Sequence, residues 1–227
     1  MTISLNLINI GHNYYSKKGI ITAIKYPLNL TIENPLTFIL GPNGSGKTTL
    51  LSLISGQLFP TNGSVQLSIG GRNIDGLKKN KLLKQHIVFS FQEALFDRRY
   101  TIIKCLRMHG LIFGLSYSEI NSLIKELLQE FGLWEKRNMY ISQVSGGQRK
   151  QLEIIRSLLI ALTRKKKNEF VFITDEPTAF CDINAKKRIW NHLSSLKDAG
   201  MNLLVSTNDL KEAERYESII VFLRKGT

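Results

Sequence analysis

The chain has 227 residues, of which 43% are hydrophobic and 22% are charged, and its formal net charge is +13. This composition excludes a disordered chain, and the length suits one domain or one domain with an inserted subdomain. No apolar run reaches the roughly 18 residues that a membrane-spanning helix needs. The N-terminus lacks a basic start followed by an apolar block, so we expect no signal peptide.

The positive charge and the two cysteines say little about function. The charge suits an anionic membrane surface, a nucleic acid, or simply a solvated surface in a lysine-rich proteome, and charge alone does not decide between them. Cys105 and Cys181 lie far apart and in no metal-binding spacing, so we expect two reduced thiols in a cytoplasmic protein.

The first 40 residues alternate apolar and polar positions, which is typical of strands, with an exposed turn at 16–19. Residues 35–40 form a short apolar run that ends at Gly41, as a buried strand does. The next elements expected are a helix at 46–57 and strands at 64–69 and 86–90.

The pattern then becomes helical and later alternates again. Helices are expected at 101–113, 117–132, 146–162 and 184–199, and strands at 170–174, 202–206 and 219–223. Strands alternating with helices predict a mostly parallel sheet. We therefore expect an α/β fold with an N-terminal antiparallel β subdomain and a helical insertion. Residues 1–227 would form one domain, with a core at about 1–91 and 145–227 and a helical subdomain at about 92–144.

Residues 41–48, GPNGSGKT, match the phosphate-binding loop G-x-x-x-x-G-K-[ST], with a strand before and a helix after. Glycines allow backbone N–H groups to surround an anion, and the following helix directs its positive end to the same place. We expect Lys47 to reach the outer phosphates and the Thr48 hydroxyl to bind Mg²⁺. The nucleotide-binding residues expected here are Gly41, Pro42, Asn43, Gly44, Ser45, Gly46, Lys47, Thr48 and Thr49. The loop predicts a P-loop NTPase core.

Two carboxylates end the expected strand at 170–174. Asp175 and Glu176 would lie at the carboxyl edge of the sheet, beside the phosphate-binding loop. Asp175 suits a role in holding Mg²⁺, and Glu176 suits the orientation and polarisation of an attacking water.

A second anion site is expected where VSGGQRKQ, residues 144–151, opens a helix. Ser145 can cap this helix, and Gly146 and Gly147 expose backbone N–H groups. The segment is similar to the Ser-Gly-Gly-Gln signature of ABC-type ATPases, with Val144 where Leu is usual.

The chain resembles the nucleotide-binding domain of ABC transporters over essentially its full length. Besides the loop and the signature, FSFQEALF contains Gln92 in the place of the family's Gln loop. FVFITDE resembles the Walker B strand, and PTAFCD resembles the D-loop region ending in Asp182. The resemblance implies that Gln92 touches Mg²⁺ and the membrane partner, and that Tyr14 or Tyr15, with Tyr15 selected, stacks on adenine.

In this family two domains enclose two ATP molecules head to tail. The resemblance implies that Ser145, Gly146, Gly147 and Gln148 cover a nucleotide bound to a partner, so a homodimer or heterodimer of such domains is expected. Lys47, Gln92, Glu176 and Asn208 form the expected catalytic set, with Thr48, Gln92 and Asp175 at the metal.

Asn208 departs from the family pattern. The family commonly has Ser-Thr-His-Asp where this chain has STND, residues 206–209. Asn keeps a donor and an acceptor, but it is shorter and cannot become a cation. Asn208 would then be a natural variant with slower hydrolysis, the weaker site of a heterodimer, or a deliberate or neutral change.

The function expected from the resemblance is ATP binding and hydrolysis that energises export by a separate membrane-spanning subunit. The chain would lie in the cytoplasm, on the inner face of the membrane, without direct contact with nucleic acid. One alternative is a soluble ABC-type ATPase acting on nucleic acid or the ribosome. The other is a regulatory subunit that binds ATP with weak hydrolysis.

Overall fold

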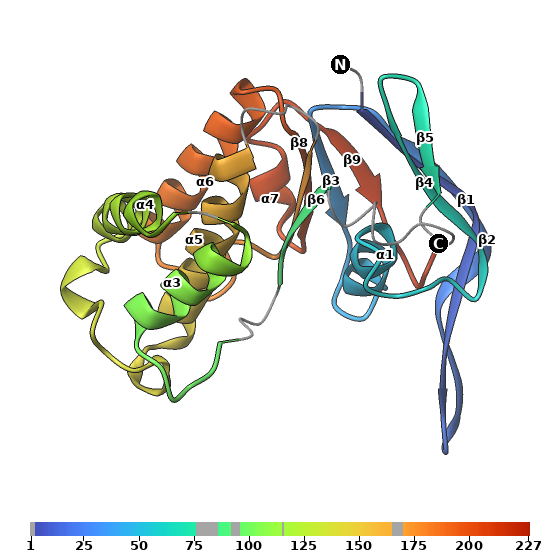
Figure 1. Ribbon diagram of the computed structural model, residues 1–227. Helices are drawn as coiled ribbons and strands as arrows, with labels where there is room; N and C mark the ends of the chain where they lie inside the picture. The colour runs from blue at the N-terminus through green and yellow to red at the C-terminus, as the bar shows by residue number, and fades with distance from the viewer. Residues whose placement is uncertain (1–2, 76–85, 92–95, 115, 165–169) are drawn as a thin grey trace. The chain divides into compact units, whose positions relative to one another are not determined.

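The computed structural model describes residues 3–75, 86–91, 96–114, 116–164 and 170–227 (Figure 1). The chain divides into two compact units. The first comprises Met1–Phe89, Asn168–Glu176 and Gly200–Thr227, and the second comprises Ser90–Lys167 and Pro177–Ala199. The division into a core and a helical subdomain that the sequence suggests stays a prediction.

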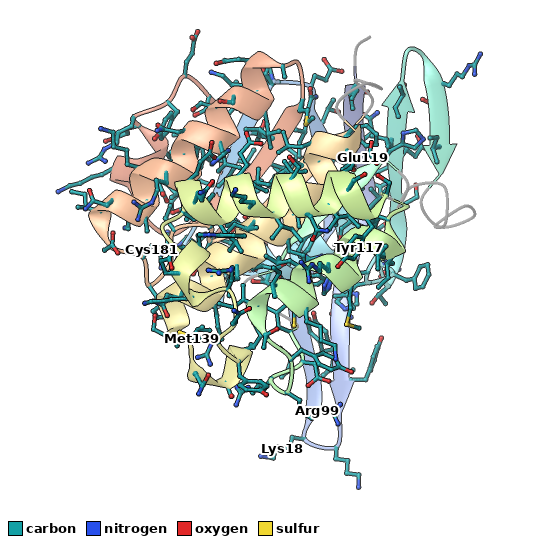
Figure 2. All side chains as sticks on the ribbon, turned by 60° about the vertical axis from the view of Figure 1, so that its left-hand side comes forward. Lys18, Arg99, Tyr117, Glu119, Met139 and Cys181 are labelled. Atoms are coloured by element: carbon teal, nitrogen blue, oxygen red, sulfur yellow. The ribbon has the colours of Figure 1, made fainter. Side chains whose placement is uncertain are left out.

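An antiparallel sheet of four strands in the order β2-β1-β4-β5 belongs to the first unit. Its strands are β1 (Ile3–Ser16), β2 (Gly19–Ile32), β4 (Asn62–Ile69) and β5 (Arg72–Asp75). Alternate side chains of β1, including Leu5 and Leu7, are buried, and Leu5 pairs with Ile32 of β2 and Leu67 of β4. β1 and β2 continue together as a hairpin with Lys18 at its turn (Figure 2).

The second sheet has five strands in the order β6-β7-β8-β3-β9. They are β3 (Leu36–Leu40), β6 (Ile87–Ser90), β7 (Val171–Asp175), β8 (Asn202–Thr207) and β9 (Ile219–Phe222). β3 pairs in parallel with β8 and β9, and β7 pairs in parallel with β8. All residues of β3 and β7 are buried, as expected for central parallel strands. The carboxyl ends of β3, β7 and β8 lead directly into Gly41, Glu176 and Asn208.

One hydrophobic core joins both sheets of the first unit to helix α1 (Lys47–Ile54) (Figure 1). Leu50, Leu51 and Ile54 of α1 are fully buried in it. The short helix α7 (Leu210–Ala213) follows β8, and the Asp209 side chain accepts a hydrogen bond from the Lys211 N–H at its start. The burial of Leu50, Leu51 and Ile54 fixes helix α1 at the end of the loop that precedes it.

The second unit is helical in the residues that the structure describes. It contains α3 (Ile102–Ile112), α4 (Tyr117–Glu130), α5 (Gly146–Arg164), α6 (Ile183–Asp198) and 3-10 turns at Trp134–Lys136 and Ile141–Gln143. Local side chains define where helices begin: Ser116 and Glu119 form a capping box on α4, and Asp182 caps α6 through the Ala185 N–H.

The predicted α/β fold, with a parallel sheet and a separate antiparallel sheet, is confirmed. The expected helices and strands also occur, with ends that differ by a few residues. The sequence patterns missed β5: its residues, RNID, are mostly polar, whereas β6 and β9, which are equally short, are mostly apolar and were predicted. Among the described residues, no helix is both long and apolar enough to cross a membrane.

Candidate functional site

The loop at residues 41–48 is shaped by two glycines at which any Cβ would clash with neighbouring backbone. A Cβ on Gly41 would lie 2.3 Å from the carbonyl oxygen of Leu223. Gly46 has a φ of 103° and caps α1, and a Cβ there would lie 2.6 Å from the carbonyl oxygen of Ala23. The loop thus turns tightly against its neighbours and leads straight into the N-terminus of α1.

Lys47 is buried under this loop, with 5% of the residue exposed. Its Nζ donates to the carbonyl oxygens of Gly41 and Pro42, at 2.8 and 3.2 Å. The same Nζ lies 3.6 Å from Oε1 of Glu176. The two residues singled out in the loop and at the strand end therefore meet, and the cation lies against the backbone of the loop.

Thr48 and Asp175 also meet, although 127 positions separate them. The Thr48 hydroxyl donates to Oδ2 of Asp175 at 2.7 Å, and the Ser206 hydroxyl donates to Oδ1 of the same carboxylate. A hydroxyl and a carboxylate are the oxygen ligands that Mg²⁺ prefers, and Mg²⁺ commonly uses one or two carboxylates together with substrate phosphates. This donor set fits the metal.

Glu176 adopts an unusual backbone conformation, with a φ of 47°. Its N–H donates to Oγ and to the carbonyl oxygen of Ser206, at 3.0 and 3.2 Å. A non-glycine residue at positive φ is held there by its surroundings, and such strain concentrates at functional sites. Ser206 thus holds the carboxylate of Asp175 and the backbone of Glu176 at the end of β7.

Other loop residues differ in exposure. Pro42, Asn43, Gly44 and Thr48 are exposed, whereas Ser45 is buried. The Ser45 hydroxyl has no hydrogen-bond partner within the described part of the chain. A buried hydroxyl without a partner destabilises the folded chain, so the Ser45 hydroxyl is suited to donate a hydrogen bond to an acceptor such as a phosphate oxygen.

Asn208 is exposed at the end of β8 and reaches the phosphate-binding loop. Its Nδ2 donates to Oδ1 of Asn43 at 3.3 Å. The preceding Thr207 donates to Glu212 at 2.8 Å and accepts from the Asp209 N–H at 3.1 Å, which fixes this turn. Asn208 therefore lies at the edge of the loop.

Tyr14 and Tyr15 lie in β1 and differ in direction. The Tyr14 hydroxyl lies 3.2 Å from Oγ1 of Thr49 in α1, and Tyr14 is 41% exposed. Tyr15 is 68% exposed. Because neighbouring strand residues point to opposite faces, Tyr14 is the one directed toward α1.

The signature segment opens helix α5 in the second unit. The Ser145 hydroxyl accepts from the Gln148 N–H at 3.2 Å, and the Ser145 N–H donates to Oε1 of Gln148 at 3.1 Å. A Cβ on Gly146 would meet nothing within 4 Å, whereas a Cβ on Gly147 would lie 2.5 Å from the carbonyl oxygen of Phe180. The segment is a reciprocally capped helix start at which Gly146 is exposed and Gly147 is half-buried.

Gln92 lies outside the described residues, but Phe91 before it is held by α5. Nζ of Lys150 donates to the Phe91 carbonyl oxygen at 2.8 Å, and the Phe91 N–H donates to Oε1 of Glu153 at 3.1 Å. Glu153 is fully buried and also pairs with Arg156, whose Nε donates to Oε2 at 2.9 Å. Both polar groups of the Phe91 main chain are thus bound by the helix that begins at the signature.

The family model described as ABC transporter matches residues 27–179. The chain belongs to the ABC transporter family. It is an ATP-binding domain of that family, as the sequence motifs indicated.

Relatives in this family include export proteins. The Nod factor export ATP-binding protein I of Cupriavidus pinatubonensis is 33% identical over 195 residues, covering 86% of this chain and 57% of that protein. The retinal-specific phospholipid-transporting ATPase ABCA4 of Mus musculus is 31% identical, covering 88% of this chain and 8% of that protein. The chain spans 52% to 59% of the length of three Nod factor export relatives.

Solved ABC cassettes share the fold. The ATP-binding cassette MJ0796, in a dimeric post-hydrolysis state bound to ADP and Pi, superposes with a TM-score of 0.81 at 27% identity. The superposition covers 98% of this ABC chain and 95% of that chain.

Two features of the ABC site were not found from the sequence. Ser206 was read only as part of STND, although it binds the carboxylate of Asp175 and the N–H of Glu176. Lys150 and Glu153 were not singled out either. Their signal was charged residues at a three-residue spacing within a helix that is buried from residue 150 to residue 161.

Proposed function

We propose that this chain binds and hydrolyses ATP and thereby energises export by a separate membrane-spanning subunit. The observation that carries the proposal is the junction of the loop with the strand end: Lys47 lies 3.6 Å from Glu176, and Thr48 bonds Asp175. Membership of the ABC transporter family supports ATP as the substrate, and the three relatives named for Nod factor export support export.

The first unit would hold the nucleotide. Backbone N–H groups of residues 43–48 would surround its phosphates, Lys47 would neutralise their charge, and the Ser45 hydroxyl would gain the partner that it lacks among the described residues. Thr49 lies at the base of the loop in α1 and bonds Tyr14. We assign the aromatic contact with adenine to this part of β1. The orientation of Tyr14 favours Tyr14 for this contact, whereas the sequence analysis selected Tyr15.

Thr48 and Asp175 would hold Mg²⁺, with Gln92 as a further ligand. When bound, the metal neutralises charge that develops on the transferred phosphoryl group. Glu176 would orient and polarise the attacking water as general base, because its carboxylate lies at the strand end, 3.6 Å from Nζ of Lys47. Lys47 stabilises the negative charge of the transition state, and Asn208 offers an amide donor at the loop's edge.

The second half-site would act on another chain. Ser145, Gly146, Gly147 and Gln148 form a capped helix start, which is suited to an anion. We propose that it covers the nucleotide of a second nucleotide-binding domain, so that pairing completes both sites. We also propose a division of the chain into a core at 1–91 and 145–227 and a helical subdomain at 92–144. We further propose that the chain lies on the inner face of the membrane.

A second candidate function is ATP binding with weak hydrolysis, as a regulatory subunit. Asn208 favours it, because an amide cannot supply the cation that a His can, and here it bonds Asn43. Glu176 at the strand end argues for turnover.

Phosphate release at saturating Mg-ATP tests the proposal. We expect turnover by the wild type and its loss in Glu176→Gln, which should remain paired in Mg-ATP by light scattering. Glu33→Gln removes an exposed carboxylate elsewhere in the same unit and should behave as the wild type. A wild type that releases no phosphate, or a Glu176→Gln variant as active as the wild type, would refute hydrolysis at this site. Capture of a membrane protein of about six spans by the ATP-trapped chain, expected of such transporters, tests the transport part.

A further inference from the structure

The hairpin formed by β1 and β2 extends beyond the sheet to which it belongs (Figure 1). Strand β4 pairs with β1 only as far as Gly11, whereas β1 and β2 remain paired to Ser16 and Gly19. Within the described part of the chain, the outer hairpin is therefore a ribbon of two strands, and Figure 2 shows Lys18 at its free end. A ribbon of only two strands is marginally stable in water, so contact with another surface would stabilise it.

Both faces of this ribbon expose large apolar side chains. Residues 14–22 are all exposed, and Tyr15, Ile20 and Ile21 are 68%, 65% and 63% exposed. Tyr15 lies opposite Ile20, whereas Ile21 lies opposite Tyr14. Because neighbouring residues of a strand point to opposite faces, the two pairs lie on opposite faces of the ribbon. One flat protein surface would cover only one of these faces, whereas a lipid interface surrounds an inserted ribbon on both.

The charge of the hairpin is suited to anionic headgroups. Residues 3–32, which comprise both strands and their turn, contain three lysines and no acidic residue. Lys17 and Lys18 are exposed in the turn, directly beside the exposed apolar residues, and Lys25 is exposed in β2. Each lysine close to an anionic membrane surface strengthens binding about fivefold. The ribbon therefore combines apolar side chains with a basic tip, as segments that lie in a lipid interface do.

We propose that the tip of this hairpin, residues 16–21, inserts into the interfacial region of an anionic membrane. Ile20 and Ile21 enter the boundary between headgroups and acyl chains, and Lys17 and Lys18 bind the headgroup phosphates. The inference rests on the proposed place of the chain at the inner face of the membrane. It requires neither nucleotide nor the membrane-spanning subunit, so it can fail while the proposed hydrolysis holds.

Co-sedimentation of the nucleotide-free chain with vesicles tests the insertion. We expect binding to vesicles of phosphatidylglycerol and phosphatidylcholine, and far weaker binding to phosphatidylcholine alone. Lys17→Gln combined with Lys18→Gln should weaken binding about tenfold or more, because two charges are lost at the membrane surface. Lys211→Gln combined with Lys225→Gln is the matched control. It removes two exposed lysines elsewhere in the same unit, has the same net charge, and should bind as the wild type does.

Ile20→Thr combined with Ile21→Thr tests the apolar contribution. Threonine is also β-branched and favours strands, so the ribbon should be retained while apolar surface is lost. Binding should fall about tenfold or more. Ile219→Thr combined with Ile220→Thr makes the same change on β9 of the same unit, where the two residues are 47% and 41% exposed, and it should leave binding unchanged.

Hydrogen exchange measured by mass spectrometry locates the contact without any substitution. Anionic vesicles should slow the exchange of residues 16–21 and leave that of β4 unchanged. Absent binding to anionic vesicles, or binding as strong in both hairpin variants as in the wild type, overturns the proposal. Protection of residues 16–21 by a protein alone, either a second copy or a captured membrane protein, also overturns it and makes the ribbon a protein contact. Phosphate release tests the proposed hydrolysis separately from these outcomes.

Discussion

Replacing Gly147 by alanine should destabilise the second unit, whereas the same change at Gly146 should not. Both glycines lie in the first turn of α5, so both variants add one methyl group in the same helical setting. The structure distinguishes them by their surroundings. The new Cβ meets nothing within 4 Å at Gly146, but it lies 2.5 Å from the Phe180 carbonyl oxygen at Gly147.

The size of the effect follows from this geometry. Ordinary van der Waals contact begins at 3.4 Å, so the backbone at Phe180 or the helix must move by 0.9 Å (3.4 − 2.5). Forced packing of this kind costs about 1–3 kcal/mol. Alanine also gains up to about 1 kcal/mol of helix propensity over glycine, and because both variants share that gain, it cancels in their comparison. The free energies of unfolding should therefore differ by about 2 kcal/mol.

Thermal and urea unfolding without nucleotide measure this difference. The two tryptophans of the chain, Trp134 and Trp190, both lie in the second unit, so their fluorescence reports its unfolding. For a chain of this size, about 2 kcal/mol corresponds to a Tm lower by about 4–8 °C in Gly147→Ala than in Gly146→Ala. Equal Tm values, or a more stable Gly147→Ala, would show that the contact between the signature and Phe180 does not restrict this position.

Two further predictions concern reactivity and turnover. Burial, together with the Asp97 charge, raises the pKa of the Cys105 thiol from 9.0 to about 11. Little Cys105 thiolate is therefore present at pH 8, so iodoacetamide should modify the half-buried Cys181 first. Equal rates of modification of the two cysteines, measured by mass spectrometry, would contradict this. Loss of one polar contact in a preorganised site can cost about 2.7–4 kcal/mol in the barrier, so Asn208→His should raise kcat by up to about 10²–10³-fold. An unchanged kcat would remove any importance from this position.

Features encoded in short stretches of sequence were predictable. The loop at 41–48 needs glycine at 41 and 46 because the carbonyl oxygens of Leu223 and Ala23 lie close to these positions. The sequence motif contains glycine at both positions, so the loop could be predicted from it. The carboxylates at 175 and 176 follow a run of buried residues, so their place at a strand end could be inferred without knowledge of the fold. The strand order required the structure, since local patterns do not specify which strands are neighbours.

Contacts between distant residues were not predictable. Ser206 and Asp175 are 31 positions apart, and Lys150 and Phe91 are 59 apart, so no periodicity links them. The orientation of Tyr14 depends on a shift of one residue in strand register, which the alternation of β1 leaves open. The positive φ of Phe180 runs against local propensity, which favours Gly or Asn there.

The hold of α5 on Phe91 bears on how this position can change during evolution. Lys150 and Glu153 bind the carbonyl oxygen and the N–H of residue 91, which nearly every amino acid supplies alike. The main-chain bonds therefore restrict the side chain at 91 little, although the Phe91 ring also lies 5.7 Å from Cζ of Arg156, while proline, which has no N–H, is barred. The residues that must be retained for these bonds are instead Lys150 and Glu153 of α5.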